Sequence, residues 1–149
     1  MVFASVLKEN PIKRPHLAQA AVRKARQTLP NIVFKPLIDI PHDDMPYYYS
    51  ATDAIITTSV HEGWPNCIKE SLACNLPFIA TDTSDLAEIA AKEKSCHICP
   101  DNPDDLAKAL LDTLSQERPT ELYKHVEHMS MDQFIKNITN IYKKVMQNN

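Results

Sequence analysis

The chain has 149 residues and a formal net charge of -3, and 44% of its residues are hydrophobic. This length fits one domain large enough to bury a core, and the composition is ordinary for a globular protein. The sequence carries no basic block of the kind found in dedicated nucleic-acid-binding proteins, and no apolar run long enough to span a membrane. The amino-terminal residues lack a signal-peptide pattern, so we expect a cytoplasmic location and reduced thiols at all four cysteines.

Short apolar runs alternate with segments of helical periodicity along most of the chain. The runs predict strands at residues 2–6, 32–37, 54–59, 77–81 and 95–99. Apolar residues recur every four positions from Leu17 to Leu29 and from Leu106 to Leu114, which predicts helices there. This alternation indicates an α/β fold: a Rossmann-like parallel sheet of about five strands with helices on both faces.

The carboxyl-terminal part, residues 119–147, has helical periodicity only. Its second half places one apolar stripe along a helix: Met131, Phe134, Ile135, Ile138, Ile141, Tyr142 and Val145. The chain shows no internal repeat or clear linker. We therefore expect residues 1–149 to form one domain, with residues 119–147 as a helical tail.

The stretch HEGWPNCIKESLACNLP contains Gly63, the only glycine in the chain. It lies between a predicted strand and a helical segment, at the carboxyl end of a parallel strand, where ligands bind in open α/β sheets. We expect the helix to begin near Asn66, a good N-cap residue, with Pro65 just before it. Free N–H groups at such a helix start attract anions. Gly63 then either permits a tight turn with positive φ or lets the backbone approach a ligand.

Two carboxylates, Glu62 and Glu70, are placed eight residues apart in the turn and one turn into the helix. A carboxylate accepts two hydrogen bonds from vicinal hydroxyls, and the helix start suits phosphate. A nucleotide-sugar carries both groups. The simpler alternative is that both glutamates are solvated surface residues.

The stretch from Ser59 to Ile89 resembles the signature of family 4 glycosyltransferases, which are retaining enzymes of GT-B fold. The matching residues are Ser59, Glu62, Gly63, Glu70, Ala73, Asn75 and Pro77, followed by the strand FIAT. Similarity is strongest over residues 45–114 and extends, more weakly, over nearly the whole chain. The resemblance implies the carboxyl-terminal, donor-binding domain of such an enzyme.

The resemblance also implies roles for individual residues. Glu62 would lie at the transferred sugar as the catalytic candidate, and Glu70 would hold the ribose hydroxyls of the donor. The backbone from Gly63 to Asn66 would face phosphate or sugar. Lys13 and Arg14, with Lys8 a weaker candidate, would neutralise the diphosphate and so stabilise the departing nucleoside diphosphate. Such enzymes need no metal or other cofactor, because protein cations perform that task.

The chain departs from the family pattern at three places. Thr83, Ser84 and Asp85 stand where a pair of glycines, or glycine and aspartate, is usual. Asn75 stands where a glycine commonly ends the helix, a mild change because asparagine tolerates the left-handed conformation. One strand–helix unit of the donor-binding half is missing before residue 32.

The acceptor-binding half of a GT-B enzyme is absent from the sequence. Either this chain is a fragment, or it pairs with a separate chain. We expect an acceptor-binding domain or subunit as partner, or self-association through the last helix, with any membrane contact made through a partner. The isolated chain should transfer no sugar. The alternative function is a non-catalytic Rossmann-like domain that binds a partner.

Two further features stay open on the sequence alone. Cys96 and Cys99 have the spacing of zinc ligands, although no second pair completes a site, and a strand is the better interpretation. Trp64 either borders the donor pocket or packs against the domain.

Overall fold

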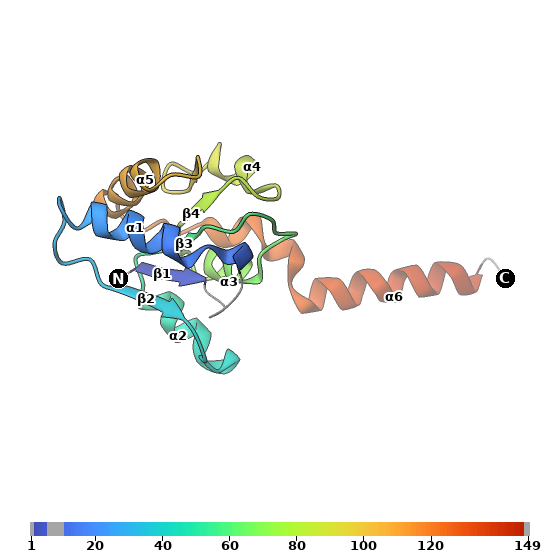
Figure 1. Ribbon diagram of the computed structural model, residues 1–149. Coiled ribbons are helices and arrows are strands. Elements are labelled where there is room, and N and C mark those ends of the chain that lie inside the picture. Colours follow the sequence, from blue (N-terminus) through green and yellow to red (C-terminus); the bar gives the residue numbers. More distant parts are fainter. Residues whose placement is uncertain (1, 6–10, 148–149) are drawn as a thin grey trace.

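The computed structural model describes the backbone of residues 2–5 and the whole of residues 11–147. One parallel sheet has the strand order β2-β1-β3-β4-β5. The strands are β1 (Val2–Ser5), β2 (Phe34–Leu37), β3 (Ala54–Thr57), β4 (Phe78–Thr81) and β5 (His97–Cys99). β3, β4 and β5 pair in chain order, whereas β2 joins them through β1. The predicted α/β class and parallel sheet are confirmed (Figure 1).

Helices cover both faces of the sheet, as predicted. The helices of the globular part are α1 (Pro15–Ala25), α2 (Met45–Ser50), α3 (Asn66–Ala73), α4 (Leu86–Ala90) and α5 (Pro103–Ser115). Ile56 and Ile79 pack with α1 and α5 in one core cluster. Their neighbours Ile55 and Phe78 pack with α2, α3 and α4 in the other. This alternation follows from the two-residue period of a strand and explains why β3 and β4 are wholly apolar or β-branched.

The strand order reverses direction at β1. The chain passes from β1 to β2 on one side and then crosses to β3 on the other. The helices that follow β1 and β3, α1 and α3, therefore pack in the two different core clusters, an arrangement that opens a crevice at the carboxyl ends of these strands. The short 3-10 helix η1 (Pro11–Lys13) lies in the loop after β1, and Val60 N donates to Ile12 O at 2.8 Å. This bond ties the two loops together at the edge of the crevice.

Helix α3 begins at Asn66, as predicted, but its N-cap residue differs from the prediction. Pro65, with extended φ and ψ, is the N-cap, and Asn66 is the first helical residue with no side-chain cap. The prediction of Asn66 as N-cap is therefore wrong. At the other end Asn75 has a φ of 55°, so it does take the left-handed conformation expected of it. Ser84 also has a φ of 55°, which shows that the TSD loop keeps a backbone shape suited to glycine.

The predicted tail divides into two unlike parts. The 3-10 helices η3 (Leu122–His125) and η4 (Glu127–Met129) lie beside the globular core. Leu122 and Val126 are buried in the core cluster that also contains residues of α3 and α4. Residues 119–130 therefore belong to the globular part and do not form an extension. Only α6 (Met131–Gln147) projects away from the rest of the chain (Figure 1).

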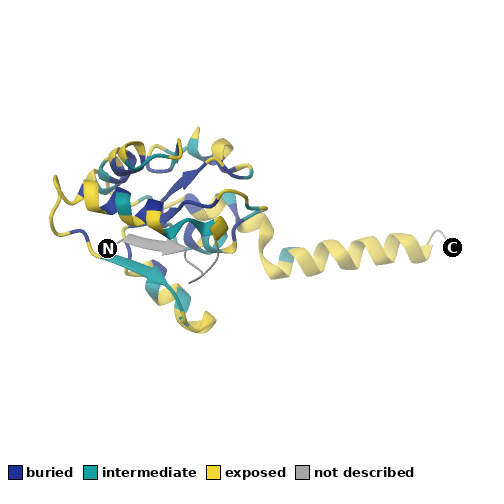
Figure 2. Ribbon diagram, viewed as in Figure 1, coloured by how far each residue is buried: buried dark blue, intermediate teal, exposed yellow. Residues whose placement is uncertain are grey.

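Every residue of helix α6 is exposed except Gln133, which is partly buried. No residue of this fully described helix is buried (Figure 2). Its exposed apolar side chains are those of Met131, Phe134, Ile135, Ile138, Ile141, Tyr142, Val145 and Met146. We call this set the α6 stripe. Within the described part of the chain, no helix is sufficiently long and apolar to traverse a lipid bilayer.

We expect truncation after Ser130 to change the free energy of unfolding by no more than about 0.5 kcal/mol, because α6 buries nothing. Truncation after Glu121 is the matched control. It also removes Leu122 and Val126 from the core and should cost at least about 2 kcal/mol. Urea unfolding followed by circular dichroism measures both. Equal losses from the two truncations would show that α6 does pack against the domain.

Candidate functional site

A cleft of about 510 Å³ lies where β1, β2 and β3 end. Its walls come from the loops after these strands and from α2 and α3. The lining residues are Lys13, Leu37, Asp39, Ile40, Met45, Tyr49, Glu62, Trp64, Pro65, Asn66, Cys67 and Glu70. Five of the seven predicted site residues are thus brought to one cavity, at the position where an open α/β sheet binds ligands. Of the other candidates, Lys8 lies outside the described residues.

Glu62 is held by two donors at the edge of the cleft. Ser59 Oγ donates to Glu62 Oε1 at 2.7 Å, and the Lys13 ammonium donates to the same oxygen. Burial acts to raise the pKa of Glu62, but the hydrogen bonds from Lys13 and Ser59 and the charge of Lys13 outweigh it, so the pKa is lowered. Glu62 is therefore ionised at neutral pH and forms an ion pair with Lys13.

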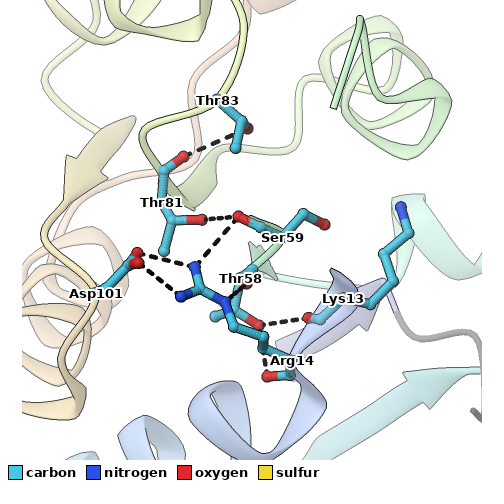
Figure 3. Close-up of polar contacts among 7 residues, drawn as sticks. All are labelled: Lys13, Arg14, Thr58, Ser59, Thr81, Thr83 and Asp101. Atoms are coloured by element: carbon cyan, nitrogen blue, oxygen red, sulfur yellow. Dashed lines mark hydrogen bonds and ion pairs between the residues drawn. The ribbon is translucent and has the colours of Figure 1, made fainter. Parts of the chain in front are cut away.

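Lys13 and Arg14 are adjacent in sequence, but their side chains diverge (Figure 3). Arg14 is absent from the described cleft lining. Its guanidinium instead makes a bidentate pair with Asp101, at 2.6 Å and 2.8 Å. The left-handed backbone of Arg14, with a φ of 45°, accompanies this change of direction. The structure thus places only one of the two predicted basic residues at the cleft.

Arg14 joins three loops at the carboxyl edge of the sheet. Its Nε donates to the Thr58 carbonyl at 2.7 Å, and a second nitrogen donates to the Ser59 carbonyl at 3.3 Å. Thr58 Oγ1 in turn lies 2.9 Å from the carbonyl oxygens of Lys13 and Arg14 (Figure 3). These bonds link the loop after β1 to the loop after β3, while Asp101 brings in the loop after β5. The contacts fix the backbone from which Lys13 and Glu62 project.

Glu70 faces the cleft from α3 and is bound from α2. The hydroxyl of Tyr49 donates to Glu70 Oε2 at 2.9 Å. Burial raises the pKa of Tyr49 well above its ordinary value, and the negative charge of Glu70 raises it further. Tyr49 therefore stays protonated and acts as a hydrogen-bond donor to a carboxylate.

Gly63 lies in the exposed turn between Glu62 and the start of α3. Its φ is not positive, so the explanation that the turn requires a left-handed glycine is wrong. No heavy atom of the described residues lies within 4 Å of a Cβ built at this position. The described residues therefore leave room for a side chain here. Gly63 stands three residues before Asn66, the first residue of α3, and the first N–H groups of an α-helix are left unbonded within the helix.

Trp64 does both things that the sequence left open. Its half-buried side chain packs against the core cluster of α2, α3 and α4, and it also lines the cleft. Trp64 is the only tryptophan in the chain, so tryptophan fluorescence reports on this one position at the cleft wall.

The two cysteines with zinc-like spacing lie on opposite faces of the sheet. Cys96 belongs to one core cluster and Cys99 to the other, so their thiols do not converge. Burial raises the pKa of each thiol to about 11. Among the described residues, no group of three or more His, Cys, Asp or Glu side chains is placed to hold a metal ion. That the enzyme transfers sugar without a metal ion stays a prediction.

Sequence reasoning missed Tyr49 and Asp101 as partners of site residues. Tyr49 is one of three consecutive tyrosines, and the phase of the short helix α2 decides which of them faces inward. Asp101 follows β5, and its pairing with Arg14 spans 87 positions of sequence. The signal for Asp101 was its place directly after a strand, at the same edge of the sheet as Arg14.

Comparison with known proteins identifies the family and the fold of the chain. The protein-family model for glycosyl transferases group 1 matches residues 9–116. O-antigen chain mannosyltransferase B of Escherichia coli is 24% identical over 83 residues, which are 56% of this chain and 22% of that enzyme. A chain in the crystal structure of the GtfA/B complex has a TM-score of 0.72 at 16% identity, over 97% of this chain and 36% of that one.

The chain therefore spans only 22% and 36% of the lengths of these two relatives. The likeness to the GtfA/B structure establishes a shared fold, and the family match covers well over half of the chain. The chain belongs to the group 1 glycosyltransferase family.

Proposed function

We propose that this chain is the donor-binding half of a GT-B glycosyltransferase that uses a nucleoside-diphosphate sugar. The observation that carries the proposal is the convergence of Lys13, Glu62 and Glu70 on one cleft beside the start of α3. These groups match the three parts of such a donor: a cation for diphosphate, and carboxylates for the hydroxyls of sugar and ribose. Assignment to family 4 and to the retaining class forms part of the same proposal.

Lys13 is the cation that acts on the diphosphate. It is bound to Glu62, and an entering diphosphate offers its ammonium a second anionic partner at the same place. As the bond from the anomeric carbon to the phosphate oxygen breaks, negative charge grows on the leaving nucleoside diphosphate. Lys13 and the first N–H groups of α3 stabilise that charge. Glu62, held by Ser59, is then oriented toward the sugar.

The partner of this half is an acceptor-binding domain or subunit. Transfer requires an acceptor hydroxyl held against the anomeric carbon of the donor, and an isolated donor-binding half does not supply it. The α6 stripe is an apolar surface of the kind that such a partner would cover. The structural relative at TM-score 0.72 comes from a two-component complex, GtfA/B, which supports a two-chain arrangement here. We expect the isolated chain to transfer no sugar.

A non-catalytic domain that binds a partner is the second candidate, because the α6 stripe alone would serve it. The two functions differ in one property. A donor-binding half binds a nucleotide in the cleft, whereas a pure binding module has no need to do so.

Titration of the chain with UDP, GDP and ADP separates the two candidates. We expect one of these nucleotides to bind and to change the fluorescence of Trp64, because its side chain lines the cleft. Lys13→Met should weaken that binding by roughly tenfold through loss of a charge-assisted contact. The matched control is Lys24→Met, which removes an exposed lysine paired with Asp104 outside the cleft. Absence of any saturable fluorescence change with all three nucleotides would favour the binding module.

A further inference from the structure

Two residues of α2 line the cleft, Met45 and Tyr49, and only Tyr49 carries a polar group. Among the residues of α2, all of which are described, only Tyr49 is buried, with 1% of its surface exposed. Its ring packs in the core cluster that also contains Ile68 and Leu72 of α3. The ring thus fills the core between the two helices while its hydroxyl emerges beside Glu70. A buried tyrosine commonly needs such a partner for its polar end.

The bond from Tyr49 has a defined direction, since the tyrosine stays protonated and Glu70 accepts. A carboxylate has two oxygens and about four acceptor positions, of which Tyr49 occupies one on Oε2. Among the described residues, no other side-chain hydrogen bond to Glu70 is formed, which leaves its remaining acceptor positions for a ligand in the cleft. A hydrogen bond from a rigid ring thus limits rotation of a side chain that a glutamate otherwise samples freely.

Arg118 fixes the helix that carries Tyr49. Its guanidinium donates to the carbonyl oxygens of Tyr49, Ser50 and Thr52, at 3.1 Å, 2.8 Å and 2.9 Å. It also donates to the carbonyl of Cys74, the C-cap of α3, at 3.0 Å. The carboxyl ends of α2 and α3 are therefore joined by one cation, which suits the negative end of each helix.

We propose that Tyr49 is a positioning residue for Glu70, supported from the carboxyl ends of both helices by Arg118, and that it orients the carboxylate to accept both hydroxyls of a ribose. The proposal rests on the proposed function, which places the donor ribose at Glu70. Arg118 thus holds the carboxyl ends of both helices, and the Tyr49 hydroxyl holds the Glu70 carboxylate at the cleft.

The test compares a ribonucleotide with its analogue that lacks both hydroxyls. The probe is whichever of UDP, GDP and ADP binds tightest, together with its 2′,3′-dideoxy counterpart. Tyr49→Phe keeps the ring in the core and removes only the donor to Glu70. We expect it to weaken binding of the ribonucleotide by about three- to tenfold and to leave the dideoxynucleotide unchanged. The preference for ribose should therefore fall, which loss of packing alone would not produce.

Tyr47→Phe is the matched control, because Tyr47 lies on the same helix with 75% of its surface exposed. It should bind both nucleotides as the unmodified chain does. Arg118→Gln is the second variant, at a residue outside the described lining of the cleft. Like Tyr49→Phe, it should lower the preference for the ribonucleotide over the dideoxynucleotide. The folded fraction of each variant is measured by circular dichroism beside each titration.

The outcomes separate this inference from the proposed function. If Glu70→Ala abolishes the ribose preference while Tyr49→Phe and Arg118→Gln keep it, Tyr49 does not position Glu70 and the inference fails alone. If Glu70→Ala also keeps the preference, the ribose is not at Glu70, and the proposed assignment fails together with the inference. If both Tyr49→Phe and Arg118→Gln weaken binding of the ribonucleotide but not of the dideoxynucleotide, the inference is supported.

Discussion

Replacing Glu70 by alanine is expected to weaken binding of a free nucleoside diphosphate by about 1.5–3 kcal/mol, or roughly ten- to 150-fold. The reason is that Glu70 is the only carboxylate in the described cleft lining that comes from α3, and ribose hydroxyls would lose a charged acceptor. Replacing Glu62 by alanine should leave binding of the free diphosphate nearly unchanged, because its carboxylate is expected at the sugar. Only the sugar-bearing donor should then bind more weakly. Calorimetric titration with the nucleotide and with its sugar conjugate measures both differences.

The structure supplies controls for this comparison. Glu70→Ala leaves the Tyr49 hydroxyl without its acceptor, so unfolding must be measured beside binding. Glu70→Gln keeps an acceptor for Tyr49 and separates the two effects. Gly63→Val tests the turn, since the protein leaves a side chain there unobstructed. Its stability should be unchanged, and its affinity for the donor should fall. Equal loss of nucleotide affinity in Glu62→Ala and Glu70→Ala, or no loss in either, would contradict the separate assignments.

The parts of the fold that depend on local pattern were predictable. A parallel sheet follows from apolar runs that alternate with helical segments, and the Glu62–Glu70 spacing locates the loop after β3 at the cleft. Asn75 shows that local chemistry also predicts a helix end, because asparagine tolerates the left-handed conformation that it takes. These features need only the residues within one element and its flanks.

The parts that depend on contacts between distant segments were not predictable. Residues 119–130 and α6 both have helical apolar patterns, but only Leu122 and Val126 find a core to enter. Arg14 was expected beside Lys13 at the diphosphate, yet a left-handed backbone and Asp101 direct it elsewhere. An arginine gives no local signal for that conformation, unlike glycine or asparagine. The direction of the Arg14 side chain is thus set by Asp101, a partner that lies far away in the sequence.

Replacing Arg14 by methionine is expected to lower the free energy of unfolding by about 2–3 kcal/mol. The substitution keeps apolar bulk and removes a charged donor from two loop carbonyls and from Asp101. The matched control is again Lys24→Met, whose ion pair with Asp104 is exposed, with 44% and 74% of the two side chains accessible. That change should cost less than about 1 kcal/mol. Urea unfolding of both variants at neutral pH gives the comparison.

The loss of stability in Arg14→Met is expected to depend on pH. The hydrogen bond from Arg14 lowers the pKa of Asp101, against a small opposing effect of burial, and the charge of Arg14 lowers it further. A carboxylate with a lowered pKa in the folded state adds stability above its unfolded pKa and loses it as the pH falls. The difference in free energy of unfolding between Arg14→Met and the unmodified chain should therefore become smaller below about pH 4. Asp101→Asn should remove this pH dependence and cost less stability, since Arg14 keeps its two carbonyl partners.

Binding measurements on Arg14→Met decide between the two roles that the residue has been given. If Arg14 only holds the loops, Arg14→Met should mainly lower the free energy of unfolding. Its nucleotide affinity should fall only to the extent that Lys13 and Glu62 are displaced. If Arg14 neutralises the diphosphate directly, the variant should lose as much affinity as Lys13→Met and keep its stability. The bidentate pair with Asp101 and the two carbonyl contacts favour the first result. Stability no lower than that of Lys24→Met, with affinity as low as that of Lys13→Met, would overturn it.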